Sequence, residues 1–351
     1  MESITLYFRE GSSDKVYQAT IEPKDGGHVV KFAYGRRGST LSTGTKTPTP
    51  VPYDQAKAVY DKLVKEKQAK GYTPGEDGTP YQHTEKASLA TDIHCQLLNP
   101  ITAEEAEYYL NHLEFVAQEK HDGRRLILRK QGEIVTGINR QGLITALPQT
   151  LTAGMRNYPG DITLDGEAIG DTFHAFDLLA LGRSDWKDKP YLERLHRLLN
   201  VLSSFQHPNI RCVDTAYQTQ EKRELFGILK AQGKEGVVFK HVDALYTAGR
   251  PSSGGPQLKY KFYESASFIV EKVNAKRSVS LQLKKDNALV PAGNVTIPPN
   301  QQIPAPGQIV ECLYLYAFPE SGCIYQPTYS GPREDLTADD CAVDQLKYKP
   351  A

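Results

Sequence analysis

Apolar and polar residues alternate along the first part of the chain, in the runs ITLYF, KVYQATIE and HVVKFAYG. Alternation with a period of two is typical of strands that bury one face, and the turn-forming sequences EGSSDK and PKDGG separate the runs. Between residues 53 and 70 the apolar residues return at helical spacing, and lysines fill the other side. The pattern predicts a small antiparallel sheet closed by a helix, in a domain of residues 1–71.

The pattern changes twice further along the chain. Residues 72–94 are rich in glycine, proline, threonine and charge without hydrophobic periodicity, which predicts a linker. Residues 95–263 mix helical and alternating segments, beginning with a capping box at Thr102 and Glu105. Residues 264–351 contain short alternating runs such as SVSLQLKK, separated by turns. We therefore expect an α+β protein in which the last domain is built from strands.

Composition narrows the class of protein. The 351 residues are 39% hydrophobic and 24% charged, which suits globular domains with real cores. The formal net charge is zero, so a polyanionic partner must be held by local patches. The five cysteines lie far apart without metal-binding spacing, so we expect reduced thiols. Without a signal-peptide pattern or a long apolar stretch, we expect a cytoplasmic protein with no membrane partner.

The stretch VAQEKHDGRRLILRK carries the first candidate chemistry. It places Lys120 two positions before Asp122 and a glycine, and Arg125 follows at the start of an apolar strand. A protonated lysine amine is a poor nucleophile, and neighbouring cations together with a metal ion favour its neutral form. Lys120 is therefore predicted to be a nucleophile.

Charged residues also interrupt three later apolar strands. DITLDGEAIG carries Glu167, and GKEGVVFK carries Glu235 and Lys240. In GGPQLKYKFY, Lys259 and Lys261 share one face of a strand because side chains two positions apart point the same way. Two carboxylates suit Mg²⁺ or Mn²⁺, and lysines neutralise phosphate. Together these residues predict a nucleotide-phosphate site.

The segments KHDGRR, INRQG, LDGEAIG, FHAFDLL, EGVVFK and LKYKF occur in this order. In this order the segments resemble the motifs of the covalent nucleotidyltransferases, which include ATP-dependent DNA ligases, RNA ligases and mRNA capping enzymes. The resemblance implies an ATP-grasp-like nucleotidyltransferase domain of antiparallel sheets with helices, followed by an OB-fold β-barrel.

The same resemblance implies a role for each motif residue. Lys120 would attack the α-phosphate of ATP and become a lysyl-AMP. Arg125 and Arg140 would bind ribose or phosphate, and Lys259 and Lys261 would hold the α-phosphate. The further residues implied for catalysis, nucleotide binding or metal binding are Gln118 at the adenine edge, Phe176 stacked on adenine, Glu167 on the ribose and a metal, Glu235 on the metal, and Asp122, Lys240 and Arg333.

The turn AYGRRGST places Arg36 and Arg37 between glycines, where two guanidinium groups beside exposed amides suit a phosphate. Together with the strand VYQATI and the lysine-rich helix, this turn resembles a WGR domain, a DNA-end-binding module. Tyr34 stands where the tryptophan of the family's name is expected. The resemblance implies that Arg36 and Arg37 contact nucleic acid.

Near the end of the chain, the sequence PREDL resembles a ligase R-x-D-K motif. Arg333 and Asp335 are present, but Leu336 stands in place of the lysine that is associated with pyrophosphate. We therefore expect slower formation of the lysyl-AMP.

These observations favour an ATP-dependent DNA ligase that acts as a monomer, in the cytoplasm, on the nucleoid or in a phage-encoded system. Its partner would be nicked duplex DNA or a nicked duplex that contains RNA, and its cofactors ATP with Mg²⁺ or Mn²⁺. An ATP-dependent RNA ligase would use the same residues and stays open. A DNA-end binder without activity is disfavoured because the motif lysines and glutamates are intact. A capping enzyme is disfavoured because nothing in the sequence resembles its accompanying phosphatase or methyltransferase. An NAD-dependent ligase is disfavoured because its cysteine-rich zinc module is missing.

Overall fold

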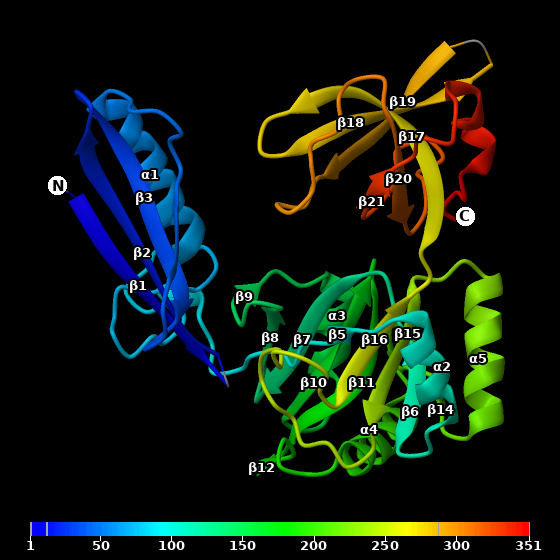
Figure 1. Cartoon of the computed structure of the whole chain (residues 1–351). Coiled ribbons are helices and arrows are strands. Elements are labelled where there is room, and N and C mark those ends of the chain that lie inside the picture. The colour runs from blue at the N-terminus through cyan, green and yellow to red at the C-terminus, as the bar shows by residue number, and fades with distance from the viewer. Residues whose placement is uncertain (1, 12, 287, 351) are drawn as a thin grey trace.

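The computed structural model describes residues 2–11, 13–286 and 288–350, arranged as an N-terminal, a middle and a C-terminal domain (Figure 1). Figure 1 shows the N-terminal domain standing beside β8 and β9 of the middle domain, with the C-terminal domain on another side. Helices and antiparallel sheets are mixed throughout, which confirms the α+β class. Among the described residues, no helix combines the length and apolar character needed to cross a membrane.

The N-terminal domain is a four-stranded antiparallel sheet in the order β1-β2-β3-β4. One helix packs on the sheet because Ala56, Tyr60 and Leu63 return to the same side and are buried. The predicted sheet closed by a helix is therefore confirmed. Its elements are β1 (Glu2–Glu10), β2 (Ser13–Lys24), β3 (Gly27–Arg36), β4 (Ser42–Thr45) and α1 (Tyr53–Gln68).

The segment predicted as a linker is shared between two domains. Thr73 exchanges backbone hydrogen bonds of 2.8 and 2.9 Å with Tyr7, and Tyr81 is buried. After the short helix η1 (Ala87–Leu89), the Thr91 amide donates to Gly142 of the middle domain. We propose that the N-terminal domain extends beyond Tyr81 and that the middle domain begins before Thr91.

The middle domain contains two sheets with helices on their outer faces. The larger sheet has seven strands in the order β12-β11-β10-β7-β8-β9, with β13 paired to β11. Its elements are β7 (Arg124–Gln131), β8 (Ile134–Asn139), β9 (Ile144–Thr145), α3 (Gln149–Arg156), β10 (Ile162–Ile169), β11 (Thr172–Leu181), β12 (Ser184–Asp185), α4 (Tyr191–Phe205) and β13 (Ile210–Cys212). Apolar residues of α3 and α4 share one core with this sheet.

The smaller sheet of the middle domain has five strands in the order β14-β6-β15-β16-β5. Its elements are β5 (Asn99–Pro100), α2 (Ala103–Asn111), β6 (Phe115–Glu119), β14 (Thr215–Ala216), α5 (Thr219–Ala231), β15 (Gly236–His241) and β16 (Gln257–Lys261). The predicted capping box opens α2, because Thr102 and Glu105 each bond the other's backbone amide. The chain passes from β6 of this sheet to β7 of the larger one through residues 120–123, so the Lys120 motif lies where the two sheets meet.

The C-terminal domain is a five-stranded antiparallel sheet in the order β19-β18-β17-β20-β21. The domain comprises β17 (Glu264–Asn274), β18 (Ser278–Lys285), β19 (Ala288–Thr296), β20 (Ile309–Tyr314), β21 (Thr328–Pro332), η2 (Ala338–Asp340) and η3 (Val343–Gln345). Within the described residues β19 and β21 do not pair, so the closed barrel implied by the resemblance is not formed. Pro291 and Pro332 lack amide donors at these edges, and Ile324 donates to Ala292 instead, at 3.0 Å.

Candidate active site

Backbone contacts fix Lys120 at the junction of the two sheets. Its amide donates to the Gly236 carbonyl at 2.9 Å, which continues the pairing of β6 with β15. Gly123 follows in the turn, and a Cβ there would lie 2.5 Å from the Ala168 carbonyl oxygen. The glycine of the Lys120 motif is therefore needed for the close approach of this turn to β10.

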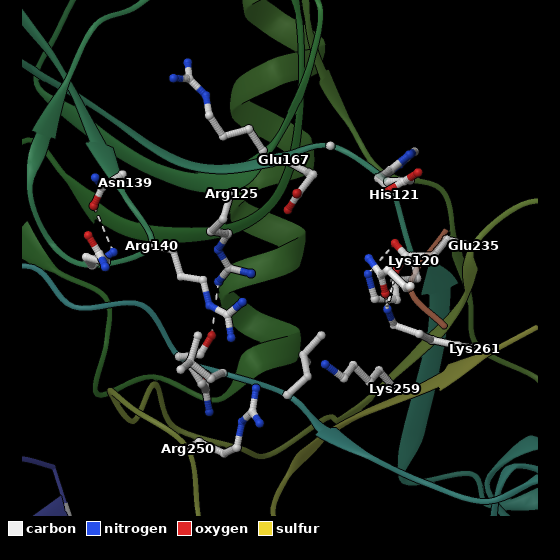
Figure 2. Close-up of a pocket in the computed structure, with 18 of the residues that line it drawn as sticks. Lys120, His121, Arg125, Asn139, Arg140, Glu167, Glu235, Arg250, Lys259 and Lys261 are labelled. Atoms are coloured by element: carbon white, nitrogen blue, oxygen red, sulfur yellow. Dashed lines mark hydrogen bonds and ion pairs between the residues drawn. The ribbon is translucent and has the colours of Figure 1, made fainter. Parts of the chain in front are cut away.

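Lys120 faces a cavity of about 510 Å³, which we call the large cavity (Figure 2). Figure 2 shows Lys261 extending to Lys120 and Glu235, while Lys259 points into the space between this group and Arg140 and Arg250. The shared face predicted for the two lysines of β16 places both on this cavity. The motif residues that line it are Lys120, Asp122, Arg125, Arg140, Glu167, Glu235, Lys259 and Lys261.

Glu235 holds two of the lysines that face the large cavity. Its carboxylate contacts the Lys120 amine and forms an ion pair of 2.8 Å with Lys261. The Glu235 side chain is buried, so the charges attract each other through little water. The geometry orients the Lys120 amine and places a proton acceptor directly beside it.

Glu167 lies on β10 and lines the same cavity. Burial raises the pKa of its carboxyl group to about 7, although Arg125 and Lys120 act in the opposite direction. Near neutral pH this carboxyl group can therefore donate or accept a hydrogen bond. Either form suits a ribose hydroxyl, whereas metal binding requires the ionised form.

Arg125 of β7 is oriented by Asp165, a carboxylate of the segment LDGEAIG to which the sequence analysis gave no role. Its guanidinium donates to Asp165 at 2.6 Å, and Tyr246 donates to the same Asp165 oxygen at 3.1 Å. The guanidinium carbon lies 4.4 Å from the centroid of the Phe176 ring. Arg125 therefore connects the large cavity with an aromatic ring at its inner end.

A small cavity of about 50 Å³ adjoins Lys120 and contains the residues that the resemblance assigns to adenine. Phe176, Gln118 and Lys240 all line it. The Gln118 amide nitrogen donates to Tyr191 at 2.9 Å and to Thr215 at 2.8 Å, which leaves its carbonyl oxygen as the group available for an adenine edge.

Lys240 is buried at the inner end of the small cavity. Burial lowers the pKa of its amine to about 7. The nitrogen lies 4.2 Å from the Phe176 ring centroid and donates to the Tyr191 hydroxyl at 3.2 Å. Lys240 therefore supports the aromatic ring and is further inside than the lysines of the large cavity.

The amine of Lys259, which faces the large cavity, has a shifted pKa. Burial, together with the neighbouring cations Lys261 and Arg250, lowers its pKa to about 8. Arg250 belongs to the glycine-rich and proline-rich loop between β15 and β16. The Asn99 side chain fixes this loop by donating to the carbonyls of Pro251 and Gly254 at 3.0 and 2.8 Å. The loop is therefore held in one position, with the Arg250 guanidinium close to Lys259.

The C-terminal domain also contributes to the large cavity. Tyr325 and Gln326 line it, and the Gln326 carbonyl oxygen accepts a hydrogen bond from Lys261. The Tyr316 hydroxyl donates to Asp122 at 2.7 Å. Asp122, the carboxylate of the Lys120 motif, therefore links the middle domain to the C-terminal domain in this structure.

Arg333 and Leu336 lie outside the large cavity. Arg333 forms ion pairs with Glu311 at 3.0 Å and Asp335 at 2.8 Å, and it does not line the large cavity. Leu336 packs against the apolar core of the C-terminal domain. In this conformation, the structure does not bring the two residues to Lys120.

Arg36 and Arg37 have different surroundings at the end of β3. Arg36 is exposed, whereas Arg37 forms an ion pair with Asp14 at 2.9 Å. The Arg37 guanidinium also donates to the Glu76 carbonyl at 2.6 Å and lies 4.7 Å from the Tyr7 ring centroid. The Arg37 side chain therefore makes contacts within the N-terminal domain, whereas the Arg36 side chain is exposed to solvent.

Sequence reasoning missed several residues of the large cavity. Arg250, Gln96, Tyr325 and Gln326 line it without belonging to a motif, and Asn139 belongs to the segment INRQG but had been given no role. A single arginine in the loop GRPSSGGP was the available signal for Arg250, because glycine-rich loops often approach ligands. The two residues from the C-terminal domain had no signal, since only domain packing brings them near Lys120.

Comparisons with known proteins agree with this geometry. The family model of the WGR domain matches residues 2–79, which confirms the resemblance seen in the N-terminal sequence. No curated protein matches the chain.

Solved structures resemble the middle and C-terminal domains. One, from a study of DNA binding by Lig E DNA ligases, is 20% identical with a TM-score of 0.53, and the match covers 69% of this chain and 100% of that one. Another, described as Pmar-Lig_Pre, is 16% identical with a TM-score of 0.55, and the match covers 69% of this chain and 67% of that one. The chain therefore has a WGR domain followed by a fold similar to that of DNA ligases.

Proposed function

We propose that the protein is an ATP-dependent DNA ligase that seals nicks between a 5′-phosphate and a 3′-hydroxyl. The observation that carries the proposal is the Lys120 amine, held by Glu235 at the wall of a cavity that also contains Lys259, Lys261 and Arg140. A nucleophilic amine surrounded by cations suits attack on a phosphate, because the cations stabilise negative charge on the phosphoryl oxygens.

In the first step, the Lys120 nitrogen forms a bond with the α-phosphorus of ATP and the bond to the β-phosphate oxygen breaks. Pyrophosphate leaves with the electron pair, the Glu235 carboxylate orients the amine, and the proton that the amine loses passes to solvent. Lys259 and Lys261 hold the α-phosphate. The product is a lysyl-AMP phosphoramide.

In the second step, an oxygen of the 5′-phosphate attacks this AMP phosphorus, and the phosphorus–nitrogen bond to Lys120 breaks. The amine leaves with a proton and the DNA 5′-end carries AMP. In the third step, the 3′-hydroxyl attacks the 5′-phosphorus, loses its proton and displaces AMP. The cations of the large cavity stabilise the phosphate charge in both steps.

A divalent cation fits the chemistry of this cavity. The described residues contain no group of three or more metal-ligating side chains, but Mg²⁺ is commonly bound by one or two carboxylates together with substrate phosphates. Glu167 and Glu235 are the two carboxylates that would hold Mg²⁺ or Mn²⁺. The ion would neutralise charge on the nucleotide phosphates.

The proposed partner is nicked duplex DNA, bound by a monomer in the cytoplasm. The WGR domain supports this choice, and exposed Arg36 is its proposed phosphate contact. A nicked duplex that contains RNA presents the same phosphates, so sealing of RNA nicks in preference to DNA nicks would instead identify an RNA ligase.

Transfer of label from [α-³²P]ATP to the protein tests the proposal. Lys120→Ala should abolish the label and leave the affinity for nicked DNA near that of the wild type, because only the nucleophile is removed. Lys272→Ala is the matched control, since Lys272 is an exposed lysine of β17 in the C-terminal domain. Label on the Lys120→Ala protein, or its absence from the wild type, would refute the proposed function.

A further inference from the structure

A third cavity lies between the N-terminal and middle domains. We call it the interdomain cavity, and its volume is about 340 Å³. Lys70 and Tyr81 enter it from the N-terminal side, and Arg140 and Gln141 enter from the loop after β8. Its full lining is Phe8, Glu10, Lys70, Pro80, Tyr81, Leu97, Arg140 and Gln141.

The two domains are in direct contact beside this cavity. A Glu10 carboxylate oxygen lies 2.9 Å from Nδ1 of His94, which precedes the middle sheets. Gly11 follows, and a Cβ there would lie 2.7 Å from the Ala248 carbonyl oxygen. With a φ of +54°, Gly11 also has a backbone conformation that favours glycine. The hairpin tip of the N-terminal domain is thus fitted against the loop that carries Arg250.

The interdomain cavity continues into the large cavity. Leu97, Arg140 and Gln141 line both, so a ligand can extend from Lys120 past Arg140 toward the N-terminal domain. Two cations, Lys70 and Arg140, face the interdomain cavity from opposite domains. Its one acidic side chain, Glu10, contacts His94. The cavity therefore favours an anion that also touches the large cavity.

Further lysines continue this positive surface on the N-terminal domain. Burial lowers the pKa of Lys67, and Lys70, Lys46 and Lys15 lower it further because these cations lie close to one another. The Lys67 amine lies 4.0 Å from the ring centroid of Tyr17. Lysines that crowd together, despite their mutual repulsion, indicate a surface that binds an extended polyanion.

We propose that the interdomain cavity holds a backbone phosphate of the nicked duplex between Lys70 and Arg140. This inference rests on the proposed ligase function and adds to it a phosphate site that neither domain forms alone. Arg140 can bind two phosphate oxygens, and Lys70 supplies a point charge from the other side. Phe8 and Tyr81 offer apolar surface to the adjoining sugar. The WGR domain thereby completes the nucleic-acid site of the middle domain.

Binding of nicked duplex DNA by full-length Lys70→Glu tests this site. One phosphate contact should be lost and its charge reversed, so we expect about a 10-fold weaker affinity near 0.1 M salt and a salt slope smaller by about one. Lys62→Glu is the matched control, because Lys62 is an exposed lysine of α1, the helix that ends just before Lys70, and it does not line the cavity. Its affinity should change by less than about 2-fold.

Neutral phosphate substitution locates the contact. In a series of nicked duplexes with one methylphosphonate each, one position near the nick should weaken binding by the wild type more than binding by Lys70→Ala. The effect of the same position should also be smaller in Arg140→Ala, because each variant keeps only one of the two cations that hold the phosphate.

The outcomes separate this inference from the proposed function. Label transfer from ATP to Lys120 should persist in Lys70→Glu, since Lys70 does not line the large cavity. Equal losses in Lys70→Glu and Lys62→Glu, or identical methylphosphonate profiles for wild type and Lys70→Ala, would overturn the phosphate site while the ligase function stands. A wild type without label transfer would refute the ligase function itself.

Discussion

The hydrogen bond between Tyr316 and Asp122 connects the C-terminal domain to the nucleophile motif, and its removal should shift the arrangement of these domains. The Tyr316 hydroxyl donates at 2.7 Å and the residue is 6% exposed. Burial raises the pKa of the Tyr316 hydroxyl, and Asp122 raises it further, so the hydroxyl remains protonated at neutral pH. We expect Tyr316→Phe to increase the population in which the two domains are apart.

The magnitude follows from what the substitution removes. The Tyr316 ring stacks on Tyr325 with centroids 4.9 Å apart, and phenylalanine keeps that packing. The lost interaction is a hydrogen bond to a carboxylate, which contributes about 1.5–3 kcal/mol. The equilibrium between the arrangements should therefore shift by roughly 10- to 100-fold. The lower end is expected, because Asp122 gains water when the domains separate.

A pair of spin labels, one on the middle domain and one on the C-terminal domain, measures this shift by pulsed dipolar spectroscopy. Single-turnover transfer from ATP provides a second readout. Because Tyr325 and Gln326 leave the large cavity when the domains separate, formation of lysyl-AMP should be slower in Tyr316→Phe.

Tyr314→Phe is the control for these measurements. The Tyr314 hydroxyl donates to the Gln345 carbonyl at 3.3 Å within the C-terminal domain, so its loss should leave the interdomain distances unchanged. An unchanged distance distribution in Tyr316→Phe, or equal shifts in the two variants, would refute the role of the Tyr316–Asp122 contact.

Two further predictions concern Lys259 and Leu336. The pKa of Lys259 is lowered to about 8, so its positive charge is present below that pH and is lost above it. Calorimetry should therefore show that the affinity of the wild type for ATP falls above about pH 8. The affinity of Lys259→Arg should decline less, because arginine keeps its charge. An equal decline in both proteins would contradict this assignment. Leu336→Lys removes an apolar contact of the C-terminal core, so the urea-induced unfolding transition should move to lower urea without faster lysyl-AMP formation. Faster lysyl-AMP formation would show that residue 336 reaches pyrophosphate.

The strands that carry the candidate active site could be predicted because each motif coincides with a local pattern. Lys259 and Lys261 alternate with apolar residues, and this period of two places both on one face whatever the rest of the chain does. The Lys120 turn was recognisable from the motif KHDGRR, and the structure shows that its glycine has no room for a side chain. Local sequence thus specifies these positions.

Partners that come from distant segments could not be predicted. Asp165 orients Arg125 through an ion pair of 2.6 Å that depends on the pairing of β7 with β10. Arg37 is engaged by Asp14 of the neighbouring strand, although the turn around it suggested a free phosphate contact. Leu336 stands at the position of a motif lysine, yet its side chain packs against the apolar core of the C-terminal domain, which forms only when the domain folds.

The ion pairs of the large cavity also bear on how the cavity could bind a phosphate, although the chain as a whole has a formal net charge of zero. The single Glu235 carboxylate pairs with both Lys120 and Lys261, so the two amines are held in place and their charges are only partly balanced. Lys259, Arg140 and Arg250 face the same cavity, and Lys259 already has a lowered pKa because of burial and its cationic neighbours. A bound phosphate would relieve this repulsion and compete with Glu235 for Lys261. In the proposed function, this competition leaves the Glu235 carboxylate in contact with the Lys120 amine alone.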